Sequence, residues 1–128
     1  MQQQLKLPRR ITVNEMVDFV LQYRRGKVFE DWTAQELLIT FRSAIIENCI
    51  GVDTQDNKIV GIGLGEPNHL YRIFHVSNIL TISKGSVGRL SKLFQRLYPG
   101  WDIQGNRRNI GLVRYKNTTR LLTLLERV

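Results

Sequence analysis

The chain has 128 residues, of which 42% are hydrophobic, so it is long enough for one domain with a core and is not a disordered tail. Its formal net charge is +8, and its single cysteine excludes an internal disulfide and a cysteine-based zinc site. No apolar run approaches the roughly 20 residues that span a bilayer, and the first residues lack the apolar core of a secretion signal. These features predict a protein of the reducing cytoplasm with no membrane partner.

The positive charge is concentrated in the last third of the chain. Residues 1–83 carry nine Lys or Arg and nine Asp or Glu, whereas residues 84–128 carry ten Lys or Arg against Asp102 and Glu126. Such a field attracts a polyanion, and three partners are open: nucleic acid, a phosphorylated cofactor or an acidic protein surface. The plainer interpretation is a basic surface that only keeps the protein soluble.

Two helix starts can be read directly from capping boxes. In Thr12-x-x-Glu15 and again in Thr33-x-x-Glu36, each side chain can satisfy a free backbone donor of the other residue. Apolar residues recur at helical spacing after both boxes. The sequence therefore predicts helices from Thr12 to Gly26 and from Thr33 to about Asn48.

A hairpin and a longer strand are expected next. Ile50–Val52 and Lys58–Leu64 flank residues 53–57, which are rich in turn formers. Glycines at 61, 63 and 65 alternate with Ile and Leu, and glycine at every second position lets a large group pack closely on that strand face. A loop is expected over residues 65–68, followed by one long strand or two short strands over residues 70–82.

The stretch Lys84-Gly85-Ser86-Val87-Gly88 joins this strand to a helix expected from about Ser86 to Tyr98. A helix N-terminus offers free backbone N–H groups and a partial positive charge, and glycines let a phosphate approach them. Three interpretations are open: a working phosphate cradle, a turn inherited from such a cradle, or an ordinary strand-to-helix turn. We favour the second.

The remaining chain completes the predicted fold. Strands are expected over residues 101–104 and 110–115, and Asn117 is a good N-cap for a last helix through Leu125. The whole order predicts an α/β (α+β) fold with a mixed central sheet flanked by about four helices. An N-terminal arm of residues 1–10 would precede this single domain of residues 11–128.

This order of elements resembles the GNAT family of N-acetyltransferases. In that family two N-terminal helices precede a hairpin and a long central strand, and a turn of the type Gln/Arg-x-x-Gly-x-Gly/Ala opens a helix that holds the pyrophosphate of acetyl-coenzyme A. The resemblance covers residues 11–128 in topology and only two short stretches in motif. It implies that a coenzyme would be bound by Lys84, Gly85, Ser86, Val87, Gly88 and Asn117.

The motifs depart from the family at several positions. Of the three positions in the glycine turn only the last, Gly88, matches, since serines occupy the other two. Asn117 matches the asparagine of the family's last helix, but Arg120 stands at the usual alanine. Leu124 stands at the tyrosine that often protonates the leaving thiolate, and a leucine cannot donate that proton. The resemblance therefore implies a degenerate GNAT-like domain.

Candidate catalytic groups are few. By position Glu66 is the best carboxylate and His75 the best imidazole for accepting a proton from an amine, although a solvated loop acid and a sheet histidine are the plainer interpretations. His69 is expected to be an ordinary loop residue. The two histidines have no third ligand at metal spacing, so no metal site is expected.

Three functions remain open from the sequence. The first is a non-catalytic basic module that contacts nucleic acid or an acidic protein, with no cofactor, and the alternative is an acyl-coenzyme A dependent N-acetyltransferase that binds acetyl-coenzyme A. The third and plainest is an oligomer-forming structural protein whose basic half docks on an acidic neighbour. GNAT-like domains of this size occur in small phage proteins, so the resemblance also implies a virion protein with a role in assembly or DNA packaging. The expected contact surface comprises Arg89, Lys92, Arg96, Arg107, Arg108, Arg114, Lys116 and Arg120.

Overall fold

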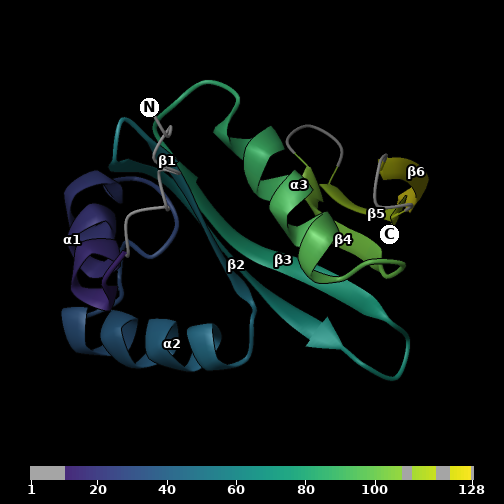
Figure 1. Ribbon diagram of the computed structural model, residues 1–128, viewed down its shortest axis with the longest axis horizontal. Helices are drawn as coiled ribbons and strands as arrows, with labels where there is room; N and C mark the ends of the chain where they lie inside the picture. The colour runs from purple at the N-terminus through teal and green to yellow at the C-terminus, as the bar shows by residue number, and fades with distance from the viewer. Residues whose placement is uncertain (1–10, 108–110, 118–121, 128) are drawn as a thin grey trace, which may run out of the picture.

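The computed structural model describes residues 11–107, 111–117 and 122–127, and within them it forms three helices and six strands (Figure 1). The helices are α1 (Val13–Tyr23), α2 (Ala34–Ile46) and α3 (Ser86–Leu97). The strands are β1 (Ile50–Gln55), β2 (Lys58–Asn68), β3 (Ile73–Thr81), β4 (Asp102–Arg107), β5 (Gly111–Asn117) and β6 (Leu122–Arg127).

The strands form one mixed sheet in the order β1-β2-β3-β4-β5-β6. All neighbours are antiparallel except β3 and β4, which are parallel and joined through α3. The predicted α+β class with a mixed sheet is therefore confirmed. No helix in the described part of the chain is long and apolar enough to cross a membrane.

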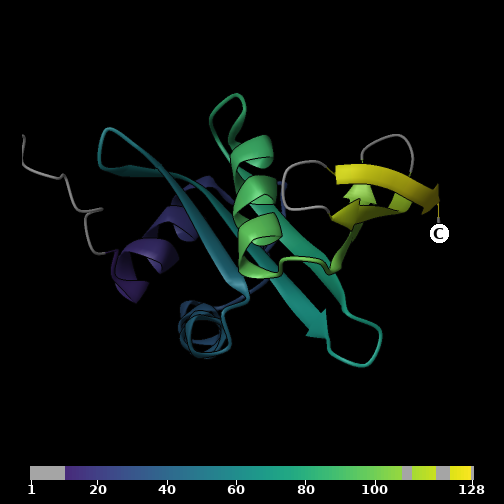
Figure 2. The same cartoon turned by 45° about the vertical axis from the view of Figure 1, so that its right-hand side comes forward.

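Helices cover both faces of the strands β1 to β3 (Figures 1 and 2). Gly61 and Gly63 lie under α3, where a Cβ would meet Ser86 and Phe94. Because successive strand residues point to opposite faces, Ile62 and Leu64, which alternate with these glycines, point the other way, toward α1 and α2. Both are buried in the core with Val20, Leu37 and Phe41.

The two capping boxes explain where α1 and α2 begin. Thr12 and Thr33 each accept a hydrogen bond from the backbone N–H of Glu15 or Glu36, and each glutamate carboxylate accepts one in return from the threonine N–H. Both predictions of the helix starts are confirmed. The Arg24 guanidinium then closes the loop between the helices by donating to two carbonyls of that loop, those of Phe29 and Trp32.

The hairpin has a shorter turn and longer strands than predicted. Asp56 and Asn57 have φ of 52° and 63°, which is the two-residue turn whose twist matches paired strands. Asp53, expected in the turn, lies in β1 opposite Gly61. The loop expected over residues 65–68 is also wrong, because β2 keeps pairing with β3 as far as Asn68 opposite Ile73.

The glycines of the hairpin strands allow close packing against α3, and the alternating glycines of β2 predicted such a close approach. A Cβ at Gly51 would lie 2.8 Å from Leu93, one at Gly61 2.3 Å from Ser86, and one at Gly63 3.0 Å from Phe94. The missing side chains therefore let α3 lie directly on the strand backbones. This close approach holds α3 against β1 and β2 from Ser86 to Phe94.

The end of the chain differs from the prediction. Residues 122–127 form β6, which pairs with β5, instead of continuing a helix from Asn117. The fourth helix is thus absent from the described residues, and residues 118–121 lie outside them, as does the predicted arm of residues 1–10. Leu122-Thr123-Leu124 also fits a period of two, and a strand here gains the hydrogen bonds of the β5 edge.

Cys49 is buried, as its place in the apolar pattern predicts, and its thiol lies 3.6 Å from the Ala44 carbonyl. Burial raises the pKa of this thiol, and the Glu47 carboxylate adds to the effect. Because the thiolate is the reactive form, we expect iodoacetamide to alkylate native protein at least about tenfold more slowly than unfolded protein. Mass spectrometry over time measures both rates, with Cys49→Ser as the blank; equal rates would contradict the buried placement.

Candidate anion-binding site

The glycine stretch forms the predicted turn from strand to helix. After β3 ends at Thr81, Gly85 adopts a left-handed conformation with φ of 82° and serves as the N-cap of α3. No side chain caps the helix there, and its first residues include no acid. Gly88 is exposed, and a Cβ there would meet no atom within 4 Å. The backbone N–H of Ser86 already donates to the Ser83 carbonyl at 3.2 Å, so an anion would approach the start of α3 at the exposed residues Val87 and Gly88.

Ser86, at the first glycine position of the resembled motif, is not part of that opening. Its side chain is fully buried, and its hydroxyl donates to Asp53 Oδ2 at 2.7 Å. Arg89 Nε donates to the same carboxylate, at 3.1 Å to Oδ1 and 2.9 Å to Oδ2. We call Asp53, Ser86 and Arg89 the Asp53 cluster. It ties the first turn of α3 to the edge of the sheet.

Asp53 was missed by the sequence reasoning, which placed it in the hairpin turn. The signal that could have identified it is alternation: Gly51 and Asp53 are two residues apart, so they share the strand face on which α3 lies. An acid on a face otherwise made of glycines needs a partner, because a buried carboxylate without one is costly. Ser86 and Arg89 are those partners.

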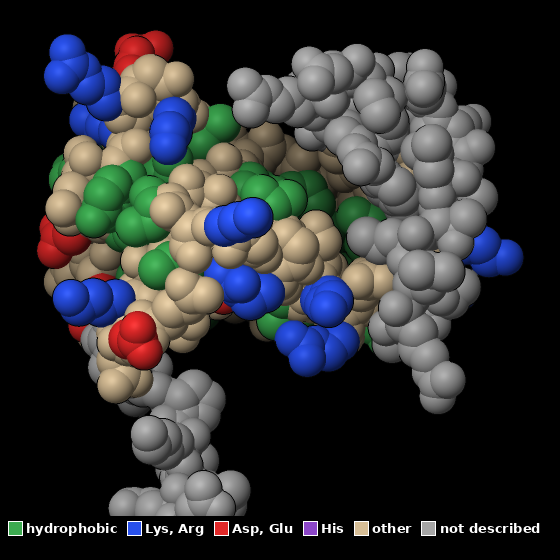
Figure 3. Space-filling view, turned by 90° about the horizontal axis from the view of Figure 1, so that it is seen from above, with side chains coloured by type: hydrophobic (Ala, Val, Ile, Leu, Met, Phe, Trp, Pro, Cys, Tyr) green, Lys and Arg blue, Asp and Glu red, His purple; other side chains and the backbone are tan. Residues whose placement is uncertain are grey.

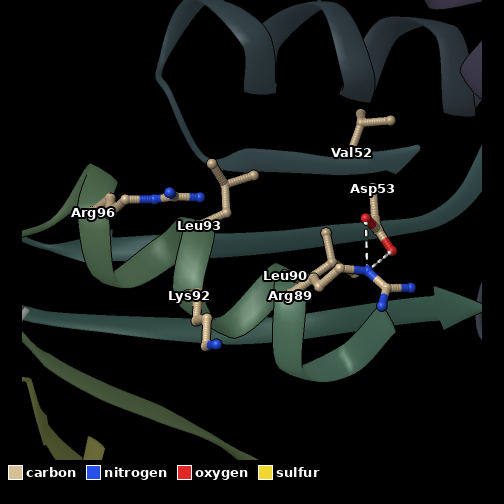
Figure 4. A pocket seen from close by; sticks show the side chains of 7 residues that line it. All are labelled: Val52, Asp53, Arg89, Leu90, Lys92, Leu93 and Arg96. Carbon is tan, nitrogen blue, oxygen red and sulfur yellow. Dashed lines mark hydrogen bonds and ion pairs between the residues drawn. The ribbon is translucent and has the colours of Figure 1, made fainter. Parts of the chain in front are cut away.

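A shallow cavity of about 230 Å³ lies next to the Asp53 cluster, between α3 and β1 (Figure 4). Figure 4 shows Leu93 pointing toward β1 and Lys92 pointing away from it, while Arg89 reaches Asp53. The wall therefore combines apolar groups with three cations and one acid. The lining residues are Val52, Asp53, Arg89, Leu90, Lys92, Leu93 and Arg96.

The cations predicted as one contact surface fall into two groups. Arg89, Lys92 and Arg96 do share one side of α3, and Figure 3 shows Lys and Arg side chains gathered across the middle of that view. Lys92 and Arg96 are exposed, whereas the Arg89 side chain is 41% exposed and paired with Asp53. The helical spacing thus predicted this group correctly.

The other cations lie elsewhere. Phe74 stacks on Tyr98 of the α3 side, with ring centroids 4.4 Å apart, so the next residue, His75, points to the opposite face. Gln104 is paired with His75 and Arg114 with Gln104, which places Arg114 on that opposite face, and Lys116 follows by alternation. The prediction that these two cations of β5 share one contact surface with the three cations of α3 is therefore wrong. Arg107 lies in β4, and Arg108 and Arg120 lie outside the described residues.

Glu66 and His75 are brought together by the sheet. They sit directly opposite each other on β2 and β3, and His75 Nδ1 lies 3.3 Å from Gln104 Nε2. This pair is on the face away from α3. It is also six residues, or about 20 Å of extended strand, before the end of β3 at Thr81. The two candidate bases are thus neighbours that lie well apart from the glycine turn.

Asn117 does not belong with the glycine turn either. Its side-chain amide is buried and donates to the carbonyl oxygens of Gln95 at 3.1 Å and of Tyr98 at 2.8 Å. Asn117 therefore satisfies carbonyl groups at the C-terminal end of α3, about 18 Å from its N-terminal end for a helix of this length. The expectation that Asn117 caps a following helix and helps bind a coenzyme is corrected by this placement.

The parallel strands β3 and β4 separate near the middle of the sheet. Val76 opposite Gly105 is their last pair, although β3 runs on to Thr81 beside β2 and β4 runs on beside β5. The register of β2 and β3 shifts at the same level, so Ser77 has no Cα partner on β2 and forms a β-bulge. The Ser77 hydroxyl donates to the Leu64 carbonyl at 3.1 Å. Open α/β sheets commonly bind ligands beyond the carboxyl ends of such strands.

Comparisons with family models, with curated proteins and with solved structures found no match to this chain. Among the described residues no group of three or more His, Cys, Asp or Glu is placed to hold a metal ion.

Proposed function

We propose that this protein is a non-catalytic, GNAT-like basic module that contacts the nucleic-acid backbone, in an assembly or packaging role. The observation that supports this most directly is the pairing within the Asp53 cluster. Asp53 is the one acid among the residues that line the cavity, and it is bonded to Ser86 and Arg89. The exposed cations Lys92 and Arg96 therefore have no neutralising carboxylate in the cavity wall. Exposed cations on one helix face attract phosphates regardless of base sequence.

The same pairing speaks against a complete coenzyme cradle. The hydroxyl of Ser86 faces the sheet and is bonded to Asp53, so it cannot turn to a ligand without breaking a buried hydrogen bond. Asn117 is occupied at the other end of α3. Of the residues implied by the resemblance, Lys84, Gly85, Val87 and Gly88 stay exposed around the uncapped helix start.

A test of the proposed function measures binding to a fluorescent DNA duplex between 50 and 200 mM salt. We expect the logarithm of affinity to fall with the logarithm of salt at a slope of about −0.9 for each phosphate contacted. Lys92→Gln should weaken binding to unrelated sequences alike and reduce that slope by about one contact. Lys27→Gln removes the same charge from the exposed loop between α1 and α2 and serves as the matched control. No binding at 50 mM salt would reject the proposal.

Acyl-coenzyme A dependent N-acetyl transfer is the second candidate. Two features support it: β3 and β4 separate after Val76, and the N-terminus of α3 has no side-chain cap. Such a coenzyme carries the reacting acyl group as a thioester; in this chain Lys84 and the backbone around Gly85 and Gly88 would hold its phosphates. Calorimetry with coenzyme A decides between the candidates. Saturable micromolar binding that Gly88→Asp abolishes would favour the enzyme. This variant should fold, because position 88 is open and an acid in the first turn suits the helix dipole.

A further inference from the structure

Strand β1 presents an unpaired edge within the described part of the sheet, because it is the first strand in the order and pairs with β2 alone. The backbone N–H of Gly65 donates to the Cys49 carbonyl at 2.9 Å, so residue 49 directs its carbonyl toward β2. Residues of a strand alternate in this respect. The backbone groups of Gly51 therefore also point to β2, whereas those of Ile50 and Val52 point outward.

The cavity described above lies beside this edge. Val52 contributes one wall, and Leu90 and Leu93 of α3 contribute the apolar part of the other. Leu93 packs over Gly51, where an added Cβ would lie 2.8 Å away. An extended segment that paired with the outer edge of β1 would thus place every second side chain along the side of α3 that borders the cavity.

The charge of that side of α3 selects the partner. Arg89 and Arg96 stand at the two ends of the cavity, Lys92 lies between them with its side chain directed away from β1, and Asp53 is already bonded to Arg89. We propose that the β1 edge and the α3 cavity together form a docking site for an extended acidic peptide segment of another protein. The segment adds a strand to β1 and directs its carboxylates at the α3 cations, as peptides that extend a sheet commonly do.

The dimensions of the two elements agree. Arg96 follows Arg89 by seven positions in α3, which is about 10.5 Å along the helix axis. Side chains on one face of an added strand recur about every 6.6 Å, so two successive acidic residues fit between the two arginines. An apolar residue at an adjoining position can fill the cavity against Leu90 and Leu93.

Other occupants match less well. A phosphodiester backbone has no N–H groups with which to continue the hydrogen-bond ladder of β1. Residues 1–10 of the chain carry Lys6, Arg9 and Arg10 and no acid, so their charge has the same sign as that of the cavity. A second copy of β1 would place two sets of these cations together, and like charges at close range are repulsive.

Hydrogen exchange of individual amides tests the strand addition. The probe is a capped eight-residue peptide of alternating Glu and Val, added to the full-length protein and followed by NMR. At saturation, the amide protons of Ile50 and Val52 should exchange at least about tenfold more slowly than in the free protein. Gly51 should be protected equally with and without the peptide, because its N–H already points to β2. Unchanged exchange at Ile50 and Val52 would overturn the proposal.

Variants and modified peptides separate strand pairing from simple charge attraction. Arg96→Glu should weaken peptide binding at least about tenfold, whereas Lys27→Glu, an equal charge change on an exposed loop, should have little effect. Methylating every second peptide nitrogen should abolish binding in one register and spare it in the other, because only one edge of the peptide faces β1. Equal binding of the two methylated peptides would overturn the proposal. A peptide of alternating Lys and Val that bound as tightly as the Glu–Val peptide would also overturn it. DNA binding is scored separately, so failure here leaves the proposed function standing.

Discussion

Replacing Gly65 by alanine is expected to cost about 3 kcal/mol of unfolding free energy, because a new methyl group has no room at this position. An added Cβ would lie 2.3 Å from the ring of Phe74 and 2.7 Å from the His75 carbonyl oxygen. Phe74 is fully buried and packs on Phe94 and Tyr98, so the ring cannot swing away, and the carbonyl belongs to the neighbouring strand. Thermal unfolding followed by circular dichroism measures the loss, expected at about 10 °C.

The matched control for Gly65→Ala is Gly88→Ala. Gly88 is exposed within the first turns of α3, and a Cβ there meets nothing within 4 Å. Alanine is favoured over glycine in helices, so this variant should gain about 0.5–1 kcal/mol. Equal effects of the two substitutions would mean that β2 and β3 do not approach as closely as described at Gly65.

Replacing Asp53 by alanine is expected to cost about 2–3 kcal/mol, because it removes the acceptor of both Ser86 and Arg89. Ser86 then keeps a fully buried hydroxyl without its partner, while Arg89 is partly exposed and can turn to water. The loss should therefore come mainly from the Ser86 side. Urea unfolding measures it.

A double-mutant cycle separates the two partners of Asp53. With Ser86→Ala in the background, Asp53→Ala should cost at least about 1 kcal/mol less than alone, since the orphaned hydroxyl is gone. With Arg89→Met in the background the cost should also fall, because Asp53 is then a largely buried carboxylate without its cation. Additive effects for Asp53 and Ser86 would contradict the 2.7 Å hydrogen bond between them.

Asp53→Ala also has an expected effect on binding. The substitution removes the one acid from the cavity wall and frees Arg89, so DNA affinity at low salt should rise while stability falls. Opposite changes in stability and binding would distinguish this acid from a core residue, whose loss lowers both. Measurements at 15 °C keep the variant folded for the comparison.

The sequence by itself determined the features that depend on a few neighbouring residues. The capping boxes placed the starts of α1 and α2, because their hydrogen bonds span only three residues. The glycine stretch marked the start of α3, and helical spacing grouped Arg89, Lys92 and Arg96 correctly. The glycines of β2 predicted a close packing partner, although not that the partner would be α3.

Only the tertiary structure decided the features that depend on contacts between distant segments. Asp53 and Ser86 are 33 residues apart, so no local pattern announces that Ser86 is bonded beneath α3 instead of facing a ligand. Asn117 is a residue type that commonly caps a helix N-terminus, but its amide donates to a carbonyl at the C-terminal end of α3. Residues 122–127 suit either periodicity, and pairing with β5 made them a strand. A short polar or apolar segment takes the conformation in which its hydrogen bonds are satisfied, and its partners are known only when the chain is folded.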